Sequence, residues 1–203
     1  MKIIKATIAA AAALALAGPA MAQKSKDTIR LSIDEQIPMI SSYHWAVGEA
    51  GQFYRRVFQG LMAYDEYKGK FVPALATSWK RIDAKTIEFN LRKGVKFHNG
   101  NDFDADDVIH TFAYVGDPKV KLRFKSRYNW IKEVQKINSH KIRVIAKKRN
   151  AMDMALLGFR LLILDSKVHK KLEKKSDYGR VSAAGTGILK IVSVDRNSGV
   201  IAE

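Results

Sequence analysis

The chain has 203 residues, of which 36 are lysine or arginine and 20 are aspartate or glutamate, so its formal net charge is +16. With 47% apolar and 9% aromatic residues, the composition excludes a chain that is disordered throughout. Cysteine does not occur, which excludes disulfides, thiolate metal sites and thiol nucleophiles.

The first 22 residues have the layout of a secretory signal peptide. Lys2 and Lys5 precede an apolar run over 6–17, and Ala20-Met-Ala22 supplies the small residues of a cleavage site. The apolar run has about 12 residues, fewer than the roughly 20 that a membrane-spanning helix needs. Since Gln23 stands where a lipoprotein needs cysteine, no lipid anchor is expected. We therefore predict export, cleavage after Ala22 and a soluble mature protein.

The first half of the mature chain is predicted to be rich in β-structure. Alternating polar and apolar residues predict a strand over 28–33, and the apolar spacing predicts a helix over 48–60. Short strands are expected over 61–64 and 70–72, on either side of a turn. The clearest pattern is a β-hairpin over 79–91.

The second half mixes helices and strands. Asp104 is placed to cap a helix over 105–114, because its carboxylate can accept from free backbone N–H groups. Two strands are predicted over 130–137 and 141–146, with a turn between them. Four further elements are expected in order: a short helix over 151–159, an apolar strand over 161–164, a helix capped by Ser166 that ends near Lys174, and a strand over 188–194 that turns back at Val200.

Most of the positive charge lies in one segment, Lys119 to Arg149, which holds twelve basic residues and a single acid, Glu133. Between Lys119 and Tyr128, basic and apolar residues alternate, which on a strand would place all the charge on one face. Such a face would suit nucleic acid, an anionic lipid headgroup or a cell-wall polymer, since clustered cations gain affinity by releasing counterions. The alternative interpretation is a solvated strand or loop surface.

The sequence contains no local signature of catalysis or metal binding. None of its five histidines belongs to an H-E-x-x-H or other i, i+4 pair. The acids from Asp102 to Asp106 begin like a calcium loop, but Asp107 and Ala113 replace the required glycine and glutamate. Serine-hydrolase signatures are missing, and Gly185-Thr-Gly187 lacks the third glycine of a nucleotide-binding fingerprint. We expect no catalytic residue, no metal site and no cofactor.

Four motifs follow one another along the chain. They are Arg56–Tyr64, Pro73–Lys80, Thr86-Ile-Glu-Phe-Asn-Leu-Arg-Lys-Gly-Val-Lys-Phe-His-Asn-Gly100 followed by Phe103-Asp-Ala-Asp-Asp-Val108, and Gly185-Thr-Gly-Ile-Leu-Lys190. Together they extend over nearly all of residues 28–203 and resemble the extracellular solute-binding proteins of family 5, the peptide, oligopeptide and nickel binders of ABC importers. The third motif is the most specific. In the fourth, Ile188 stands where the family commonly has proline.

The resemblance implies a mixed α/β fold, the first lobe of a two-lobe fold like the type II periplasmic binding proteins. Residues 23–203 would form this N-terminal lobe, with a β-rich subdomain over about 66–178 inserted between 23–65 and 179–203. Family members are normally much longer. We therefore expect a chain truncated at its C-terminus, with the second lobe absent.

The resemblance also implies a function: a substrate-binding component that captures a peptide or similar small solute in the periplasm and delivers it to an inner-membrane ABC permease. Such a protein would be a monomer, would carry out no chemistry and would need no nucleic acid. Peptide, nickel chelate, opine and oligosaccharide remain open as ligands. The implied ligand-binding residues are Asp34, Glu35, Gln36 and Ile37 after the first strand, and Gly185, Thr186 and Gly187.

The competing hypothesis, based on the charge alone, is an exported basic protein that binds nucleic acid or a cell-envelope polymer through Lys119 to Arg149. The two hypotheses differ in their response to salt. Polymer binding should weaken steeply between low and physiological salt, whereas binding in a desolvated cleft should barely change.

Overall fold

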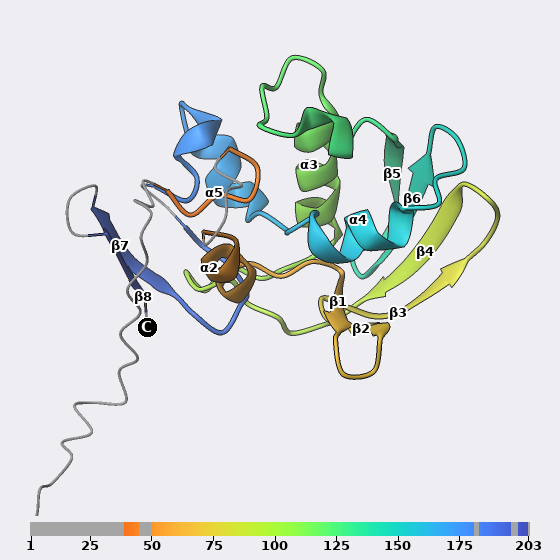
Figure 1. Cartoon of the computed structure of the whole chain (residues 1–203), viewed down its shortest axis with the longest axis horizontal. Coiled ribbons are helices and arrows are strands. Elements are labelled where there is room, and N and C mark those ends of the chain that lie inside the picture. Colours follow the sequence, from red (N-terminus) through yellow and green to blue (C-terminus); the bar gives the residue numbers. More distant parts are fainter. Residues whose placement is uncertain (1–38, 45–49, 181–182, 196–198, 203) are drawn as a thin grey trace, which may run out of the picture. The chain divides into compact units, whose positions relative to one another are not determined.

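The computed structural model describes residues 39–44, 50–180, 183–195 and 199–202 (Figure 1). All of these residues belong to the second of two compact units, residues 35–203. The predicted signal peptide and the predicted strand over 28–33 lie outside the described residues. Within the described ranges, no helix combines the length and the apolar character needed to cross a bilayer.

Helices and strands follow one another in nearly the predicted order. The described helices are α2 (Ala50–Val57), α3 (Ala105–Gly116), α4 (Asp153–Phe159) and α5 (Ser166–Lys171), with short 3-10 turns at Lys125–Arg127 and Lys175–Asp177. The described strands are β1 (Met62–Asp65), β2 (Lys70–Pro73), β3 (Ala76–Arg81), β4 (Thr86–Leu91), β5 (Ile131–Asn138), β6 (Lys141–Ala146), β7 (Ile191–Asp195) and β8 (Gly199–Ala202).

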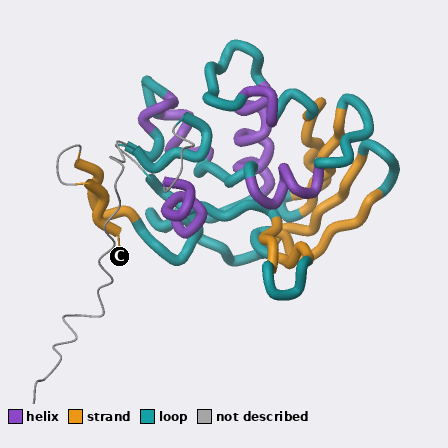
Figure 2. The backbone as a smooth tube through the Cα atoms, viewed as in Figure 1, coloured by secondary structure: helices purple, strands orange, loops and turns teal. Residues whose placement is uncertain are grey.

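The largest sheet in the described part of the chain has four antiparallel strands in the order β3-β4-β6-β5 (Figure 2). Strands β3 and β4 form the predicted hairpin, and strands β5 and β6 form a second one at the predicted turn. The turn between β3 and β4 is held by Asp83, whose carboxylate accepts the backbone N–H groups of Lys85 and Thr86 at 2.7 and 2.9 Å. The pairs β1-β2 and β7-β8 are separate antiparallel hairpins.

The core lies against one face of the two inner strands. Phe89 of β4 is opposite Ile142 of β6, and Ile87 is opposite Val144; all four side chains are buried. Between them, Glu88 lies opposite Arg143 of β6. The Glu88 side chain points to the other face of the sheet, where it pairs with Lys141 and Arg143. Buried and less buried side chains therefore alternate along most of β4.

Helix α3 packs against β5 and begins at the predicted cap. The Asp104 carboxylate accepts the backbone N–H of Asp106 at 2.7 Å, and the Asp107 carboxylate accepts the backbone N–H of Asp104 at 3.0 Å. This reciprocal pair is a capping box, which satisfies donors that the first helical turn leaves free. The helix runs to Gly116, two residues beyond the predicted end, and stops before Pro118.

The predicted strand over 161–164 is wrong. The segment has one isolated bridge, between Gly60 and Leu162, and crosses the core as irregular chain. All four of its side chains are buried. A short apolar run is typical both of a buried strand and of any segment that crosses a core, so its composition could not distinguish the two.

Residues 119–128, whose alternation would place the charge on one face if they formed a strand, are instead a loop that contains the 3-10 turn at 125–127. The Lys125 ammonium donates to the carbonyl oxygen of Val115 at 2.8 Å and to that of Asp117. It thereby satisfies carbonyls that are free at the end of α3. One of the alternating cations is thus bound within the protein, and the others do not share a strand face.

The predicted start of α5 needs a correction by one residue. Asp165, and not Ser166, is the cap: its carboxylate accepts the backbone N–H groups of Lys167 and Val168 at 2.9 and 3.2 Å. The helix ends at Lys171, earlier than predicted. Either residue type can cap a helix, and only the backbone conformation distinguishes which of two neighbours does so.

Candidate functional site

The structure describes one of the two predicted ligand-binding segments. The first, Asp34 to Ile37, lies outside the described residues. The second, Gly185 to Gly187, is a bent segment that packs against the C-terminal end of α2. There the backbone N–H of Gly187 donates to the carbonyl oxygen of Val57 at 2.8 Å, and that of Leu189 donates to Arg56 at 3.0 Å. Both acceptors belong to the last turn of the helix, where carbonyls lack partners within the helix.

Both glycines are required by this close approach. A Cβ atom added at Gly185 would lie 1.8 Å from the carbonyl oxygen of Val57, and one added at Gly187 would lie 2.0 Å from that of Arg56. No real Cβ atom tolerates such distances to backbone, so any larger residue would force α2 and the segment apart. The glycines of this motif therefore have a packing role, whatever else the segment does.

His98, from the loop after β4, is bonded to both ends of this segment. Its backbone N–H donates to the Gly185 carbonyl at 2.8 Å, and its ring Nε2 lies 2.9 Å from the Gly187 carbonyl oxygen. A carbonyl oxygen can only accept, so we assign the proton to Nε2, which leaves Nδ1 as an acceptor in the neutral ring. His98 belongs to the most specific motif, but the motif alone did not indicate this role.

Two buried polar atoms at this place lack a hydrogen-bond partner among the described residues: His98 Nδ1 and the Thr186 hydroxyl. Buried polar groups in proteins are hydrogen-bonded with few exceptions, and leaving one unpaired is costly. His98 bonds to the residues on both sides of Thr186, so the two residues that carry these atoms are neighbours. An acceptor and a hydroxyl together can receive a ligand that presents both a donor and an acceptor.

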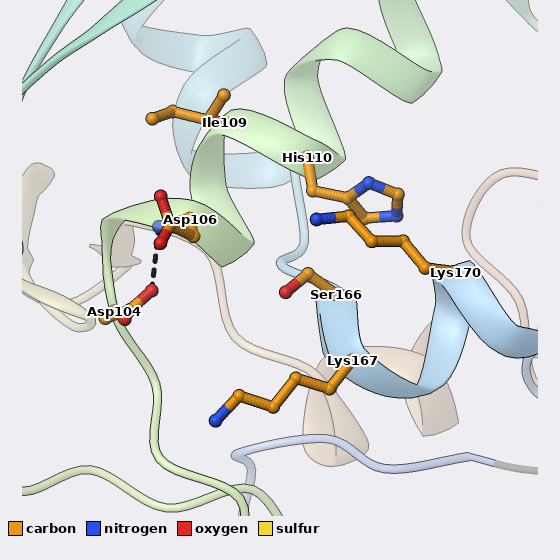
Figure 3. A pocket seen from close by; sticks show the side chains of 7 residues that line it. All are labelled: Asp104, Asp106, Ile109, His110, Ser166, Lys167 and Lys170. Atoms are coloured by element: carbon orange, nitrogen blue, oxygen red, sulfur yellow. Dashed lines mark hydrogen bonds between the residues drawn. The ribbon is translucent and has the colours of Figure 1, made fainter.

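A separate cleft of about 450 Å³ lies between the start of α3 and α5 (Figure 3). Asp104 and Asp106 line it from α3, and Lys167 and Lys170 line it from α5. Neither lysine forms an ion pair with any residue that the structure describes. The cleft is polar and carries both signs of charge, which is unlike the mostly apolar lining of small-molecule sites.

His110, beside this cleft, belongs to a cluster of rings. Its Nε2 lies 2.8 Å from Nδ1 of His169, and His44 Nε2 lies 2.8 Å from the Tyr114 hydroxyl. Burial is the main cause that lowers the pKa of His110 to about 4 and the pKa of His169 to about 3. Both imidazoles are therefore neutral at pH 7. Within the described residues, no group of three or more candidate ligands is arranged to hold a metal ion.

Solved structures show which class of protein has this fold. NikZ from Campylobacter jejuni, in complex with Ni(L-His), is similar with a TM-score of 0.76 and 24% identity over 86% of this chain and 35% of that one. The ABC transporter-associated periplasmic binding protein DppA from Helicobacter pylori, in complex with the peptide STSA, has a TM-score of 0.69 and 24% identity over 81% and 36%. The fold is that of the periplasmic binding proteins, and the chain matches about a third of each neighbour, the extent of one lobe.

The family model described as bacterial extracellular solute-binding proteins, family 5 Middle, matches residues 70–203. The chain therefore belongs to family 5 of the bacterial extracellular solute-binding proteins. This confirms both the resemblance of the four motifs and the mixed α/β fold expected from it. Proteins of this family bind solutes and are not enzymes.

Two relatives differ in the ligand that their names state. Heme-binding protein A of Haemophilus influenzae is 31% identical over 122 residues, which are 51% of this chain and 22% of that protein. Di/tripeptide-binding protein 2 of Pseudomonas aeruginosa is 29% identical over 120 residues, 50% of this chain and 23% of the relative. The chain spans less than a quarter of the length of either relative.

Proposed function

We propose that the chain acts as part of the substrate-binding component of an ABC importer. In this role it captures a peptide or a similar small solute in the periplasm and delivers it, as a monomer, to an inner-membrane permease. Family membership supports the binding role, and the peptide-binding relatives support the substrate class. No catalytic residue is required, because the solute is bound and released unchanged.

The observation that carries the proposal is the pair of unpaired polar atoms at Gly185–Gly187. A peptide ligand supplies backbone N–H groups for His98 Nδ1 and carbonyl oxygens for the Thr186 hydroxyl. Binding would give hydrogen-bond partners to both of these buried groups, which otherwise destabilise the protein because they are unpaired. We propose that this site, together with residues Asp34 to Ile37, contacts the solute.

Backbone contacts between residues 185–189 and α2 support a proposed organisation of the chain. Residues 185–189 return to bond with residues 56–57 of α2, so the two ends of the intervening chain are close together. The four-stranded sheet lies entirely within that intervening chain. This supports a subdomain over about 66–178 that is inserted between 23–65 and 179–203.

The test is to isolate the protein from the periplasm of its source and identify co-purified small molecules by native mass spectrometry. We expect a peptide, whose affinity for the emptied protein is then measured by calorimetry. Thr186→Val keeps the side-chain shape but removes one hydrogen bond, so it should weaken binding roughly tenfold. Thr77→Val, on the exposed strand β3, removes a hydroxyl elsewhere and should bind like the unaltered protein.

Two results would count against the proposal. A protein that is found only in the cytoplasm would contradict the location. Suppose that the protein carries no small molecule and that Thr186→Val binds peptide as tightly as the unaltered protein. This result would contradict the binding role of the site.

A further inference from the structure

The cations of the segment Lys119 to Arg149 fall into two groups. Some of them are bound within the protein: Lys136 pairs with Asp106 at 2.7 Å, and Lys141 and Arg143 bind the Glu88 carboxylate at 2.6 and 2.8 Å. These residues lie on the strands, and Lys125 caps α3. Six others lie in the loops that precede β5 and follow β6, and their side chains are exposed: Lys119, Lys121, Arg123, Lys147, Lys148 and Arg149.

Two segments meet at the end of the sheet where β3 turns into β4 and where β6 ends (Figure 1). The backbone N–H of Lys147 donates to the Trp130 carbonyl at 2.8 Å, and that of Ala146 donates to the Lys85 carbonyl at 2.8 Å. Residues 80–85 and 147–154 are therefore neighbours, and Arg81, Ala84 and Arg149 line one cleft between them. We call these two segments the basic end. They carry six basic residues and two acids.

The acids of the basic end do not neutralise it. Asp153 is buried and binds Arg81 through two hydrogen bonds of 2.9 Å, so this pair contributes no net charge. Asp83 accepts the backbone N–H groups of Lys85 and Thr86 in its own turn. No described carboxylate lies within ion-pair distance of Lys147, Lys148 or Arg149.

Large apolar side chains are exposed among these cations. Ile82 is 48% exposed and Met152 60%, and they lie on different segments of the basic end. Exposed apolar side chains beside clustered cations are typical of a surface that lies at a membrane interface.

We propose that the basic end docks on an anionic phospholipid membrane surface. Cations near such a surface are attracted by its negative potential, and apolar side chains gain by entering the boundary between headgroups and acyl chains. Nucleic acid would use the cations, but it offers nothing to the aliphatic Ile82 and Met152, which have no ring to stack on a base. The composition of the surface therefore fits lipid better. This docking is independent of solute binding.

The test measures sedimentation of the whole chain with vesicles of phosphatidylcholine, alone or mixed with phosphatidylglycerol. We expect binding only to the mixed vesicles, with a steep loss between low and physiological salt. The triple variant Lys147→Gln, Lys148→Gln and Arg149→Gln should lower the partition coefficient roughly 100-fold. Its control, Lys93→Gln, Lys171→Gln and Lys174→Gln, removes the same charge from exposed lysines outside the basic end and should retain most of the binding.

A second variant distinguishes lipid from nucleic acid. Replacing Ile82 and Met152 by serine should weaken vesicle binding roughly tenfold while leaving the binding of single-stranded DNA unchanged. Circular dichroism would show that every variant is folded. Equal binding to both vesicle types, equal loss in the two triple variants, or no effect of the serine variant on vesicle binding would each overturn the proposal, the last in favour of a polyanion site.

Discussion

At the scale of single residues, the Gly185–Gly187 segment shows what a motif can and cannot reveal. The motif indicated the family, and its glycines were expected to contact ligand. The structure shows that they first allow a close approach to the last turn of α2. His98 could not be selected from the sequence, because its ring partner, the Gly187 carbonyl, is 89 positions away along the chain. Only the fold brings the two together.

A substitution tests the packing role of Gly185. Gly185→Ala should lower the free energy of unfolding by about 2–3 kcal/mol, because the new Cβ would lie 1.8 Å from the Val57 carbonyl oxygen. Gly116→Ala is the control: its Cβ would meet nothing within 4 Å, so stability should be unchanged or rise by up to about 1 kcal/mol. Urea unfolding followed by circular dichroism measures both. Equal stability of the two variants would contradict the packing role.

The histidine cluster predicts a dependence of stability on pH. The pKa of His110 falls to about 4 and that of His169 to about 3, both below the ordinary value of 6.5, mainly because of burial. Between these folded and unfolded values the unfolded chain binds more protons, so the contribution of the cluster is fully present above about pH 6.5. It is lost as the pH falls from there toward 4 and then 3.

His110→Gln tests this dependence, since glutamine offers both a donor and an acceptor to His169. The free energy of unfolding of this variant should fall less steeply between pH 7 and pH 4 than that of the unaltered protein. His140→Gln, in the turn between β5 and β6, removes a histidine outside the cluster and is the control. If His110→Gln flattens the profile no more than this control does, the cluster is not the source of the pH dependence.

At the scale of the elements, periodic patterns in the sequence predicted the helices and strands that are determined by residues close together in the chain. Both hairpins of the large sheet and the capped start of α3 follow from alternation, turn residues and a capping carboxylate. The predicted strand over 161–164 was wrong because this segment is apolar for another reason, namely that it crosses the core. The segment 119–128, left open between a strand and a loop, is a loop that Lys125 holds at the end of α3.

Two aspartates that cap helices should differ strongly in their contribution to stability. Asp165 is fully buried and also accepts the side-chain amides of Asn99 and Asn101 at 2.8 and 2.7 Å, whereas Asp104 caps α3 beside an open cleft. Asp165→Ala should lower the free energy of unfolding by about 3 kcal/mol or more, since it leaves several donors unpaired. Asp104→Ala should cost about 1 kcal/mol. Similar losses in urea unfolding would contradict this difference.

At the scale of the whole molecule, the sequence indicated the amount of charge but not its arrangement. The run from Lys119 to Arg149 suggested one basic face. Folding instead binds the strand cations to acids and adds Lys80, Arg81 and Lys85 from a hairpin more than thirty residues earlier. The composition of a surface depends on which segments meet there, and the order of residues does not contain that information directly.

This arrangement predicts how salt affects stability. A net charge of +16, with many cations close together at the basic end, destabilises the compact state by mutual repulsion. Added sodium chloride screens that repulsion, so the melting temperature should rise by several degrees between low and physiological salt. Replacing Lys147, Lys148 and Arg149 by glutamine removes part of the repulsion. This variant should therefore melt higher at low salt and respond less to added salt, as measured by circular dichroism. A melting temperature that falls with salt would mean that ion pairs such as Arg81–Asp153 outweigh the repulsion.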